Sequence, residues 1–407
     1  MPVRLAVITQ SRARIGGVEA YLEALLPALA ARHDVLFWSA SGEVTARGAI
    51  ALPAGMTALT CDGVAADPLQ ALRAWRPDLL FAHGLDDAVL EARVLDIAPA
   101  AIVRHTYHGT CISSTKTMRR PGVRQCDRAF GAACLALYFP RQCGGSNPLT
   151  MARLYRAQSA RLLSLKRGAA VITLSAHMAQ DAVKNGLPPD RVHVVPPFVS
   201  TTGSARLPND SDGSLRLLFI GRLEPLKGVM GLLDALPVVS RGAGVPVRLV
   251  VAGDGTERAV LESHARLLRA ANPRIQIEFA GWQAEAGRAR LLAGTDLLVV
   301  PSVWPEPFGL VGLEAAAAGV PAVAFRAGGI PEWLHDDENG CLAAAEGARP
   351  QALADAIIRC ARSPENLTRL SAGAVRSAAA WTLDSHLTKL QHVFDSVLAQ
   401  TVARRAC

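Results

Sequence analysis

The sequence predicts an α/β protein of two domains, each built on a parallel sheet with helices on both faces. Three observations predict this class. The chain has 407 residues, more than one hydrophobic core usually serves. Half of the residues are hydrophobic and only 19% are charged, which permits sizeable cores. Short apolar runs alternate with helical patterns along the whole chain, as in repeated βαβ units.

Ten apolar runs of four to seven residues are expected to form strands. Most are continuously apolar, which is typical of parallel sheets that helices cover on both faces. The first half contains VRLAVIT from Val3, DVLFWSA from Asp34, DLLFAH from Asp78, AIVRH from Ala101 and AAVITLS from Ala169. The second half contains LRLLFIG from Leu215, VRLVVAG from Val247, IQIEFAG from Ile275, DLLVVPS from Asp296 and PAVAF from Pro321.

Helical spacing of apolar residues predicts which helix faces are buried. One face comprises Val18, Tyr21, Leu22, Leu25, Leu26 and Leu29, and a second comprises Val260, Leu267, Leu268 and Ala271. Residues 201–214 are polar and turn-rich, so we expect a linker between an N-terminal domain (1–200) and a C-terminal domain (215–384). The apolar stripe in residues 385–407 follows the last expected strand, so this helix must pack on a domain already built.

Several features bear on where the chain is expected to act. No apolar stretch reaches the roughly 18 residues of a membrane-spanning helix. The richest run, from Ala315, is broken by Gly319 and Pro321. MPVRLAVITQ predicts a first strand rather than a signal peptide. We therefore expect a cytoplasmic protein with reduced thiols.

The net charge of +8 is concentrated in one segment. Residues 100–170 carry 12 basic side chains and a single acid, Asp127. Such a patch suits an anionic surface, as of a membrane leaflet or a lipid-linked acceptor, although it could be a solubilising face. Nucleic acid is disfavoured, because the segment has few aromatic residues and no recognised nucleic-acid-binding motif.

Four of the eight cysteines, Cys111, Cys126, Cys134 and Cys143, fall within a stretch of 33 residues inside this basic segment. They form no C-x2-C pair of the kind that identifies zinc sites. A structural metal site, core thiols and a regulatory disulfide all remain open.

Glycines and charges follow the expected strands at the edge where open parallel sheets bind ligands. GRLEPLKG, from Gly221 to Gly228, places Arg222 and Lys227 after one strand, where two cations could hold a diphosphate. GDGTE places Gly253 and Gly255 before a helix, where backbone amides favour an anion. Neither the first strand nor this turn has the G-x-G-x-x-G fingerprint, which counts against a dinucleotide-dependent dehydrogenase.

PSVWPEPFGLVGLEAAAAGVP follows another strand and contains two glutamates eight residues apart, Glu306 and Glu314. We expect the EPFG turn to start a helix that ends near Gly319. A carboxylate in so apolar a segment needs donors, and paired sugar hydroxyls would supply them. An internal salt bridge with an arginine is the alternative.

These segments resemble the retaining glycosyltransferases of family 4. The similarity runs from GGVE at Gly16 through GRL…KG and EPFGLVGLE to AGGIPEWL…ENG, which spans Ala327 to Gly340. It covers nearly the entire chain and implies the GT-B fold, in which two Rossmann-like domains face a central cleft and the final helix crosses back to the first domain.

The resemblance implies a role for each matched position. Glu314 would bind the nucleotide ribose, and Glu306 would bind the transferred sugar with the backbone amides of Phe308, Gly309 and Leu310. Arg222 and Lys227 would hold the diphosphate, while backbone around Gly281 and Trp282 would contact the base. Gly16 and Gly17 would close over the donor. His105 would lie near the anomeric centre, with His108 as the alternative match, and His83 is expected to be structural. His108, Arg119 and Arg120 lie where the acceptor should bind.

The implied activity is transfer of a hexose-type sugar from a nucleoside-diphosphate sugar, with UDP favoured over GDP, to a glycan or lipid-linked acceptor. The anomeric configuration would be retained. No D-x-D metal element stands out near the donor loops, so we expect metal-independent chemistry without a cofactor. A sugar phosphorylase or nucleotide-sugar epimerase of the same fold is the main alternative, and product analysis without an acceptor would separate them. A non-catalytic binding module is a remote one.

Overall fold

The chain folds into two compact α/β units. The computed structural model describes residues 2–14, 16–45, 48–61, 69–199, 213–344 and 349–406. The N-terminal unit comprises Met1–Lys116, Asp127–Pro197 and Leu383–Cys407, and the C-terminal unit comprises Thr117–Cys126 and Phe198–Thr382. Most of the expected 201–214 linker lies outside the described residues.

The N-terminal unit is built on a seven-stranded sheet with the order β3-β2-β1-β4-β5-β8-β9, in which every neighbouring pair is parallel. Its strands are β1 (Arg4–Ser11), β2 (Asp34–Ser41), β3 (Thr57–Thr60), β4 (Leu79–Ala82), β5 (Ala100–Arg104), β8 (Ala170–Thr173) and β9 (Val192–Val194). The central strands are almost wholly buried, which explains their uninterrupted apolar sequences.

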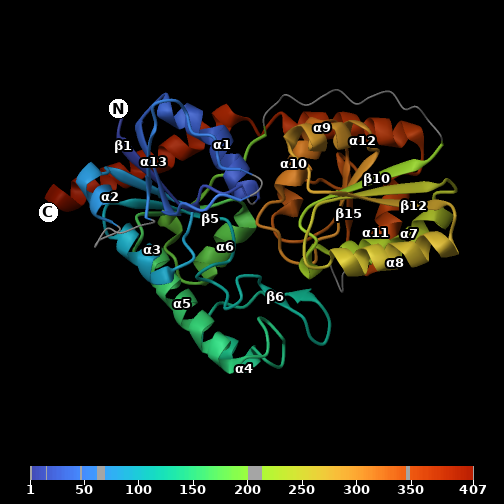
Figure 1. Ribbon diagram of the computed structural model, residues 1–407, viewed down its shortest axis with the longest axis horizontal. Helices are drawn as coiled ribbons and strands as arrows, with labels where there is room; N and C mark the ends of the chain where they lie inside the picture. Colours follow the sequence, from blue (N-terminus) through green and yellow to red (C-terminus); the bar gives the residue numbers. More distant parts are fainter. Residues whose placement is uncertain are drawn as a thin grey trace. The chain divides into compact units, whose positions relative to one another are not determined.

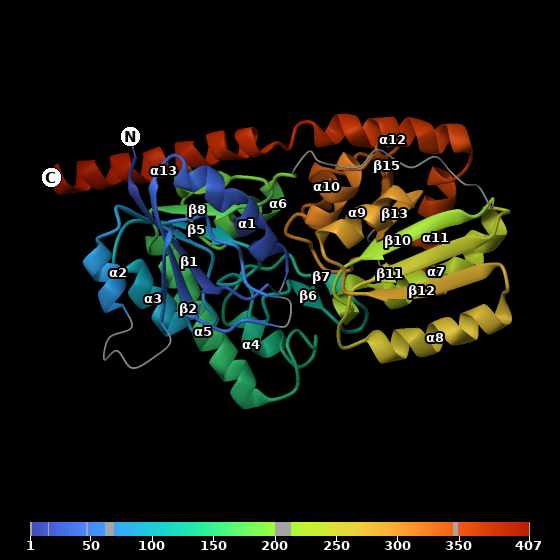
Figure 2. The ribbon, with the colours of Figure 1, turned by 45° about the horizontal axis from the view of Figure 1, so that its top comes forward.

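Helices cover both faces of this sheet (Figures 1 and 2). Apolar residues of α2 (Gln70–Trp75), α3 (Ala88–Leu95), α5 (Pro148–Arg167) and α6 (Ala176–Lys184) join one core with alternate strand residues. On the other side lie α1 (Gly17–Ala30) and α13 (Leu383–Ala406), where Tyr21 of α1 hydrogen-bonds His386 of α13. The last helix therefore completes the N-terminal unit, although it follows the C-terminal unit in sequence. The short α4 (Ala133–Leu137) precedes α5, and the 3₁₀ turn η1 (Pro189–Arg191) precedes β9.

The C-terminal unit has a six-stranded parallel sheet with the order β12-β11-β10-β13-β14-β15. The strands are β10 (Leu215–Ile220), β11 (Val247–Ala252), β12 (Ile275–Gly281), β13 (Leu297–Val300), β14 (Ala322–Phe325) and β15 (Gly340–Ala343). The strand order reverses between β10 and β13, so a crevice is expected at their carboxyl ends.

The helices of this unit lie on both faces of the sheet (Figure 2). Helices α7 (Val229–Gly242), α8 (Arg258–Ala271) and α11 (Pro350–Cys360) pack together, while α10 (Leu310–Ala317) packs with α12 (Pro364–Ala378) and α9 (Glu285–Ala293) contacts β10. The 3₁₀ turns are η2 (Pro225–Lys227) and η3 (Ile330–Glu332).

The buried face predicted for α8 is wrong. Val260 and Leu267 are 53% and 68% exposed, whereas Leu261 and Ala265 are buried against the sheet. Both sets have helical spacing, so the position of the sheet, and not the spacing, selects the inner face.

The ten expected strands are all present, and the described residues contain five further strands. Strands β3, β9 and β15 are short and lie at or near sheet edges. The pair β6 (Thr117–Met118) and β7 (Arg124–Gln125) forms an antiparallel hairpin. This hairpin groups with the C-terminal unit, although we expected all of residues 1–200 to belong to the N-terminal domain.

Candidate functional site

The C-terminal unit brings the two expected cations and Glu306 to one edge of its sheet. Arg222 and Lys227 follow β10, and Glu306 follows β13, the neighbouring strand. Strand order therefore places them at the reversal point of the sheet. The Arg222 side chain is exposed and forms no ion pair with any residue that the structure describes.

Lys227 and Glu306 form a close ion pair. The Lys227 Nζ lies 2.7 Å from Oε1 of Glu306, and the Ser302 hydroxyl donates to the same carboxylate. Glu306 is only 5% exposed. Burial raises the pKa of Glu306, but the charge of Lys227 and hydrogen bonds from Lys227, Ser302 and Trp304 outweigh burial and leave this pKa below its ordinary value. Glu306 is thus a buried, ionised acceptor beside a cation.

Glycines allow the loops around this pair to approach closely. Gly228, directly after Lys227, has φ +75°, and a Cβ there would lie 2.0 Å from the Pro301 carbonyl oxygen. Gly328 has φ +60°, and a Cβ there would lie 2.3 Å from the Glu306 carbonyl oxygen. Only glycine fits either place without a shift of backbone, so the loop geometry that presents Lys227 and Glu306 depends on both.

Glu314 lies in α10 and pairs with an arginine that was not among the expected site residues. Arg288 of α9 contacts its carboxylate at 3.0 and 3.4 Å. The Glu314 side chain is 34% exposed, far more than that of Glu306. The expected alternative of an internal salt bridge with an arginine therefore describes Glu314 in this structure, while its carboxylate stays accessible. Nothing in the local sequence around Arg288 marks it, because the pair joins residues 26 positions apart.

The remaining expected donor-site residues lie on loops of the same unit. Gly253 N–H donates to the Gly281 carbonyl oxygen at 2.8 Å, which joins the loop after β11 to the end of β12. Trp282 beside them is 44% exposed. Leu310 begins α10 and Gly309 is its N-cap, while the carbonyl oxygen of the preceding Phe308 accepts from Trp333 Nε1 at 2.7 Å. Gly255 lies against Leu223, since a Cβ there would be 2.5 Å from the Leu223 carbonyl oxygen.

The N-terminal unit has its own cavity of about 210 Å³, where β1, β4 and β5 end. It is lined by Gln10, Glu19, His83, His105, His108 and Arg161, among others. Glu19 of α1 also accepts a hydrogen bond from the Gly16 amide at 2.7 Å, which fixes the Gly16–Gly17 turn. The expected histidines and the glycine turn are thus brought to one end of this sheet.

His83 and His105 form a stacked, hydrogen-bonded pair. His83 Nδ1 and His105 Nε2 are 2.8 Å apart, and the ring centroids are 5.1 Å apart. Burial lowers the pKa of His105 to about 4 and that of His83 well below its ordinary value, so both rings are neutral near pH 7. Since His83 engages Nε2, only Nδ1 of His105 is left to face a ligand. His108 is exposed on the loop that follows.

The four clustered cysteines are not gathered into a metal site. Among the residues that the structure describes, no group of three or more His, Cys, Asp and Glu side chains is arranged to hold a metal ion. Cys111 is buried and accepts a hydrogen bond from the Lys116 amide at 3.3 Å, while Cys143 lies 3.8 Å from the Leu137 carbonyl oxygen. Cys126 groups with the C-terminal unit, whereas Cys134 stays with the N-terminal one. The candidate ligand set of the sequence analysis is therefore not formed here.

Comparison with known families accounts for both units. Residues 15–202 match the family described as Glycosyltransferase Family 4, and residues 214–363 match Glycosyl transferases group 1. The chain belongs to the family 4, group 1 glycosyltransferases. This family 4 member is 35% identical over 204 residues to a D-inositol 3-phosphate glycosyltransferase of Rhodococcus erythropolis, which covers 47% of this chain and 46% of the relative. It is 31% identical over 182 residues to a phosphatidyl-myo-inositol mannosyltransferase of Mycobacterium leprae, covering 44% and 46%. The chain spans about half the length of these curated relatives.

Solved structures confirm the fold. Anabaena Alr3699/HepE, solved with UDP-glucose, superposes with a TM-score of 0.68 at 20% identity over 98% of this chain and 100% of that one. Sucrose-phosphate synthase from Thermosynechococcus elongatus gives a TM-score of 0.68 at 17% identity over 98% and 100%. The family 4 member therefore has the GT-B fold, as the resemblance implied. In the part of the chain that is described, no helix is both long and apolar enough to span a membrane.

Proposed function

We propose that this protein is a retaining glycosyltransferase that moves a hexose-type sugar from a nucleoside-diphosphate sugar to a glycan or lipid-linked acceptor. The observation that carries this proposal is the Lys227–Glu306 pair at the reversal point of the C-terminal sheet. A buried ionised carboxylate accepts from sugar hydroxyls, and the adjacent cation suits a phosphate oxygen. The UDP-glucose complex of Alr3699/HepE supports a UDP-sugar as the donor.

In the proposed reaction the bond between sugar and phosphate breaks while negative charge builds on the leaving diphosphate. Lys227 and Arg222 would stabilise that charge, which is electrostatic stabilisation of the transition state. The acceptor would attack from the same face, and the leaving phosphate would take its proton. Glu314 would bind the ribose, and His105 would lie near the anomeric carbon. We propose that this chemistry needs neither a metal ion nor a cofactor.

The chemical class of the acceptor is proposed from the charge of the N-terminal unit. Residues 100–170 are strongly basic, and the inositol phosphate and phosphatidyl-inositol named for two relatives are anionic. We propose an anionic glycan or lipid-linked acceptor and a cytoplasmic enzyme peripheral to the membrane, acting in polysaccharide or glycoconjugate synthesis. Flotation with anionic and neutral liposomes at low and high salt tests the membrane part, and binding that ignores both lipid charge and salt would contradict it.

The first test is a thermal-shift series with UDP, GDP, ADP and dTDP, followed by product analysis of the matching nucleotide sugars with and without acceptors. A nucleotide that binds only the folded protein raises its stability as RT ln(1 + [L]/Kd). We expect selective stabilisation by UDP and a product only when an acceptor is present. Sugar phosphate formed from free phosphate, or an epimerised nucleotide sugar formed without an acceptor, would instead support the phosphorylase or epimerase alternative.

A further inference from the structure

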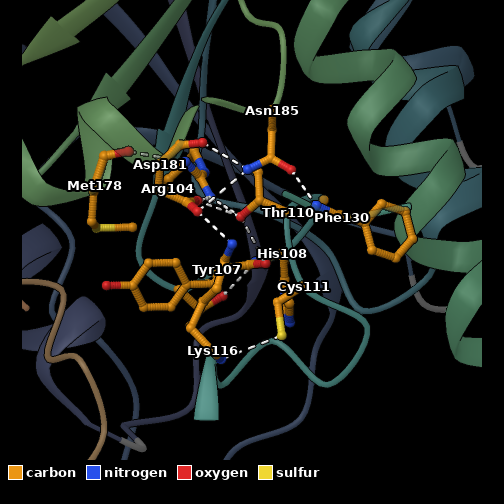
Figure 3. Close-up of polar contacts among 12 residues, drawn as sticks. Arg104, Tyr107, His108, Thr110, Cys111, Lys116, Phe130, Met178, Asp181 and Asn185 are labelled. Carbon is orange, nitrogen blue, oxygen red and sulfur yellow. Dashed lines mark hydrogen bonds and ion pairs between the residues drawn. The ribbon is translucent and has the colours of Figure 1, made fainter. Parts of the chain in front are cut away.

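A buried cluster of polar side chains, here called the junction, holds the loop of residues 105–116 that carries His105 and His108 in the N-terminal unit. The Asp181 carboxylate, on α6, accepts hydrogen bonds from four side chains, those of Arg104, Thr110, Lys116 and Asn185 (Figure 3). Its Oδ2 accepts from Arg104 Nη2 at 3.1 Å and from the Thr110 hydroxyl at 2.6 Å, and its Oδ1 accepts from Lys116 Nζ at 2.6 Å. Arg104 ends β5 directly before His105, and Lys116 ends the loop. One carboxylate therefore holds the start, the middle and the end of residues 104–116.

The same junction also contacts the residues on either side of the β6–β7 hairpin, which carries Arg119 and Arg120. Lys116 Nζ also donates to the Arg128 carbonyl oxygen at 2.7 Å. One turn after Asp181, Asn185 accepts from the Phe130 amide at 2.7 Å and donates to the Asp181 carbonyl oxygen. The chain leaves the N-terminal unit after Lys116 and returns at Asp127. Both ends of the segment that carries Arg119 and Arg120 are thus fixed to α6.

Burial makes the junction dependent on Asp181. The side chains of Arg104, Lys116 and Asp181 are 2%, 4% and 9% exposed. Two cations share one carboxylate, so loss of that carboxylate leaves two buried charges without a counter-ion. Other elements add to the constraint, since Gln158 of α5 accepts from the Gly109 amide at 2.6 Å and donates to Ser114.

The loop backbone also depends on these contacts. Ser114 and Lys116 have φ of +60° and +48°, which side-chain-bearing residues rarely adopt. Such conformations persist only where the surroundings fix them. Asp181 does not line the cavity, whereas Arg104, His105, Thr106 and His108 do.

We propose that Asp181 is a positioning residue for the acceptor side of the reaction. It acts through Arg104 and Lys116 to hold the His105–Lys116 loop and the base of the Arg119–Arg120 hairpin in one geometry. This proposal rests on the proposed glycosyl transfer.

The test compares Asp181→Asn with a matched control, Asp296→Asn. Asp296 is also a buried carboxylate bound to an arginine, Arg216, but it lies at the amino end of β13, away from the candidate site. For Asp181→Asn we expect kcat/KM for the acceptor to fall about 10- to 100-fold, as misplacement of a loop can cause. The nucleotide Kd should stay within roughly twofold, because distant sites are usually independent. Asp296→Asn should lower Tm but keep the acceptor kcat/KM of the folded protein.

Hydrogen–deuterium exchange supplies a readout that needs no turnover. Peptides covering residues 105–116 and 128–130 should exchange faster in Asp181→Asn and unchanged in Asp296→Asn. Thr110→Val removes the hydroxyl that bonds to Asp181, to Arg104 and to the Tyr107 carbonyl oxygen, while all three charges remain. It should therefore give a smaller shift in the same direction if Asp181→Asn does not fold. Unchanged exchange in the Asp181 variant, or equal loss of nucleotide affinity and acceptor kcat/KM, would overturn the positioning role. A wild-type protein that transfers no sugar would instead contradict the proposed function, with the exchange result still deciding whether Asp181 holds the loop.

Discussion

At the scale of single residues, the Lys227–Glu306 pair has the largest expected effect on function. The two groups are 2.7 Å apart, and the lysine side chain is partly exposed while the carboxylate is buried. A ligand could therefore reach the cation directly, with Glu306 beside it to accept from a sugar hydroxyl.

Replacing Lys227 by Ala should lower turnover about 100- to 1000-fold, as loss of one preorganised charge at a transition state commonly does. The variant should also raise the pKa of Glu306, because the main charge that lowers this pKa is removed. Steady-state kinetics measure the turnover, and Tm shows whether the variant is still folded. The control is Lys389→Ala, which replaces an exposed lysine on α13. Near-normal turnover in the Lys227 variant would rule out the diphosphate role.

The His83–His105 pair predicts a pH dependence of stability. The pKa of His105 falls from 6.5 unfolded to about 4 folded, so the unfolded chain binds a proton that the folded chain excludes. The stability linked to His105 is thus complete above pH 6.5 and is lost progressively as pH falls toward 4. His105 alone should lower the unfolding free energy by about 2 kcal/mol between pH 7.5 and pH 5. Urea unfolding at both pH values should show a smaller loss in His105→Gln than in wild type, and an equal loss would refute the prediction.

At the scale of elements, α8 shows why a helical pattern does not by itself select the inner face. Leu261 is fully buried and Leu267 is 68% exposed, although both lie in the same 14-residue helix. Each belongs to a set with helical spacing, and only contact with the sheet and with α7 separates them.

We expect Leu261→Ala to lower the unfolding free energy by about 2–5 kcal/mol, since it leaves a cavity in a packed core. Leu267→Ala should change it by no more than about 0.5 kcal/mol, as for other exposed substitutions. Urea denaturation of both variants tests this, and similar losses would mean that the inner face of α8 is wrongly placed.

At the scale of the whole molecule, the order of elements along the chain does not match the unit to which each element belongs. Helix α13 ends the chain but packs on the N-terminal sheet, where Phe394 is 1% exposed and its ring centroid lies 5.4 Å from that of Phe81. The N-terminal unit is therefore incomplete until the last residues of the chain are in place.

Phe394→Ala should lower the unfolding free energy of the N-terminal unit by about 3–5 kcal/mol, because it leaves a cavity in a packed core. Hydrogen exchange should speed up in β4 and β5 and stay unchanged in β10 and β11. The reciprocal variant, Leu236→Ala in the core of the C-terminal unit, should show the opposite distribution. Faster exchange in both units of both variants would show that the two units unfold as one.

The sequence by itself determined the fold class, ten strands of the two sheets and the strand-end loops that carry Arg222, Lys227 and Glu306. Those features follow from local signals, because apolar runs specify buried strands and glycines mark tight loops. Only the tertiary structure paired Arg288 with Glu314, His83 with His105 and Asp181 with Arg104 and Lys116. Each partner lies between 22 and 77 positions away in sequence. Such pairs depend on which strands become neighbours and which helix faces turn inward, and no local pattern of residues encodes that distance.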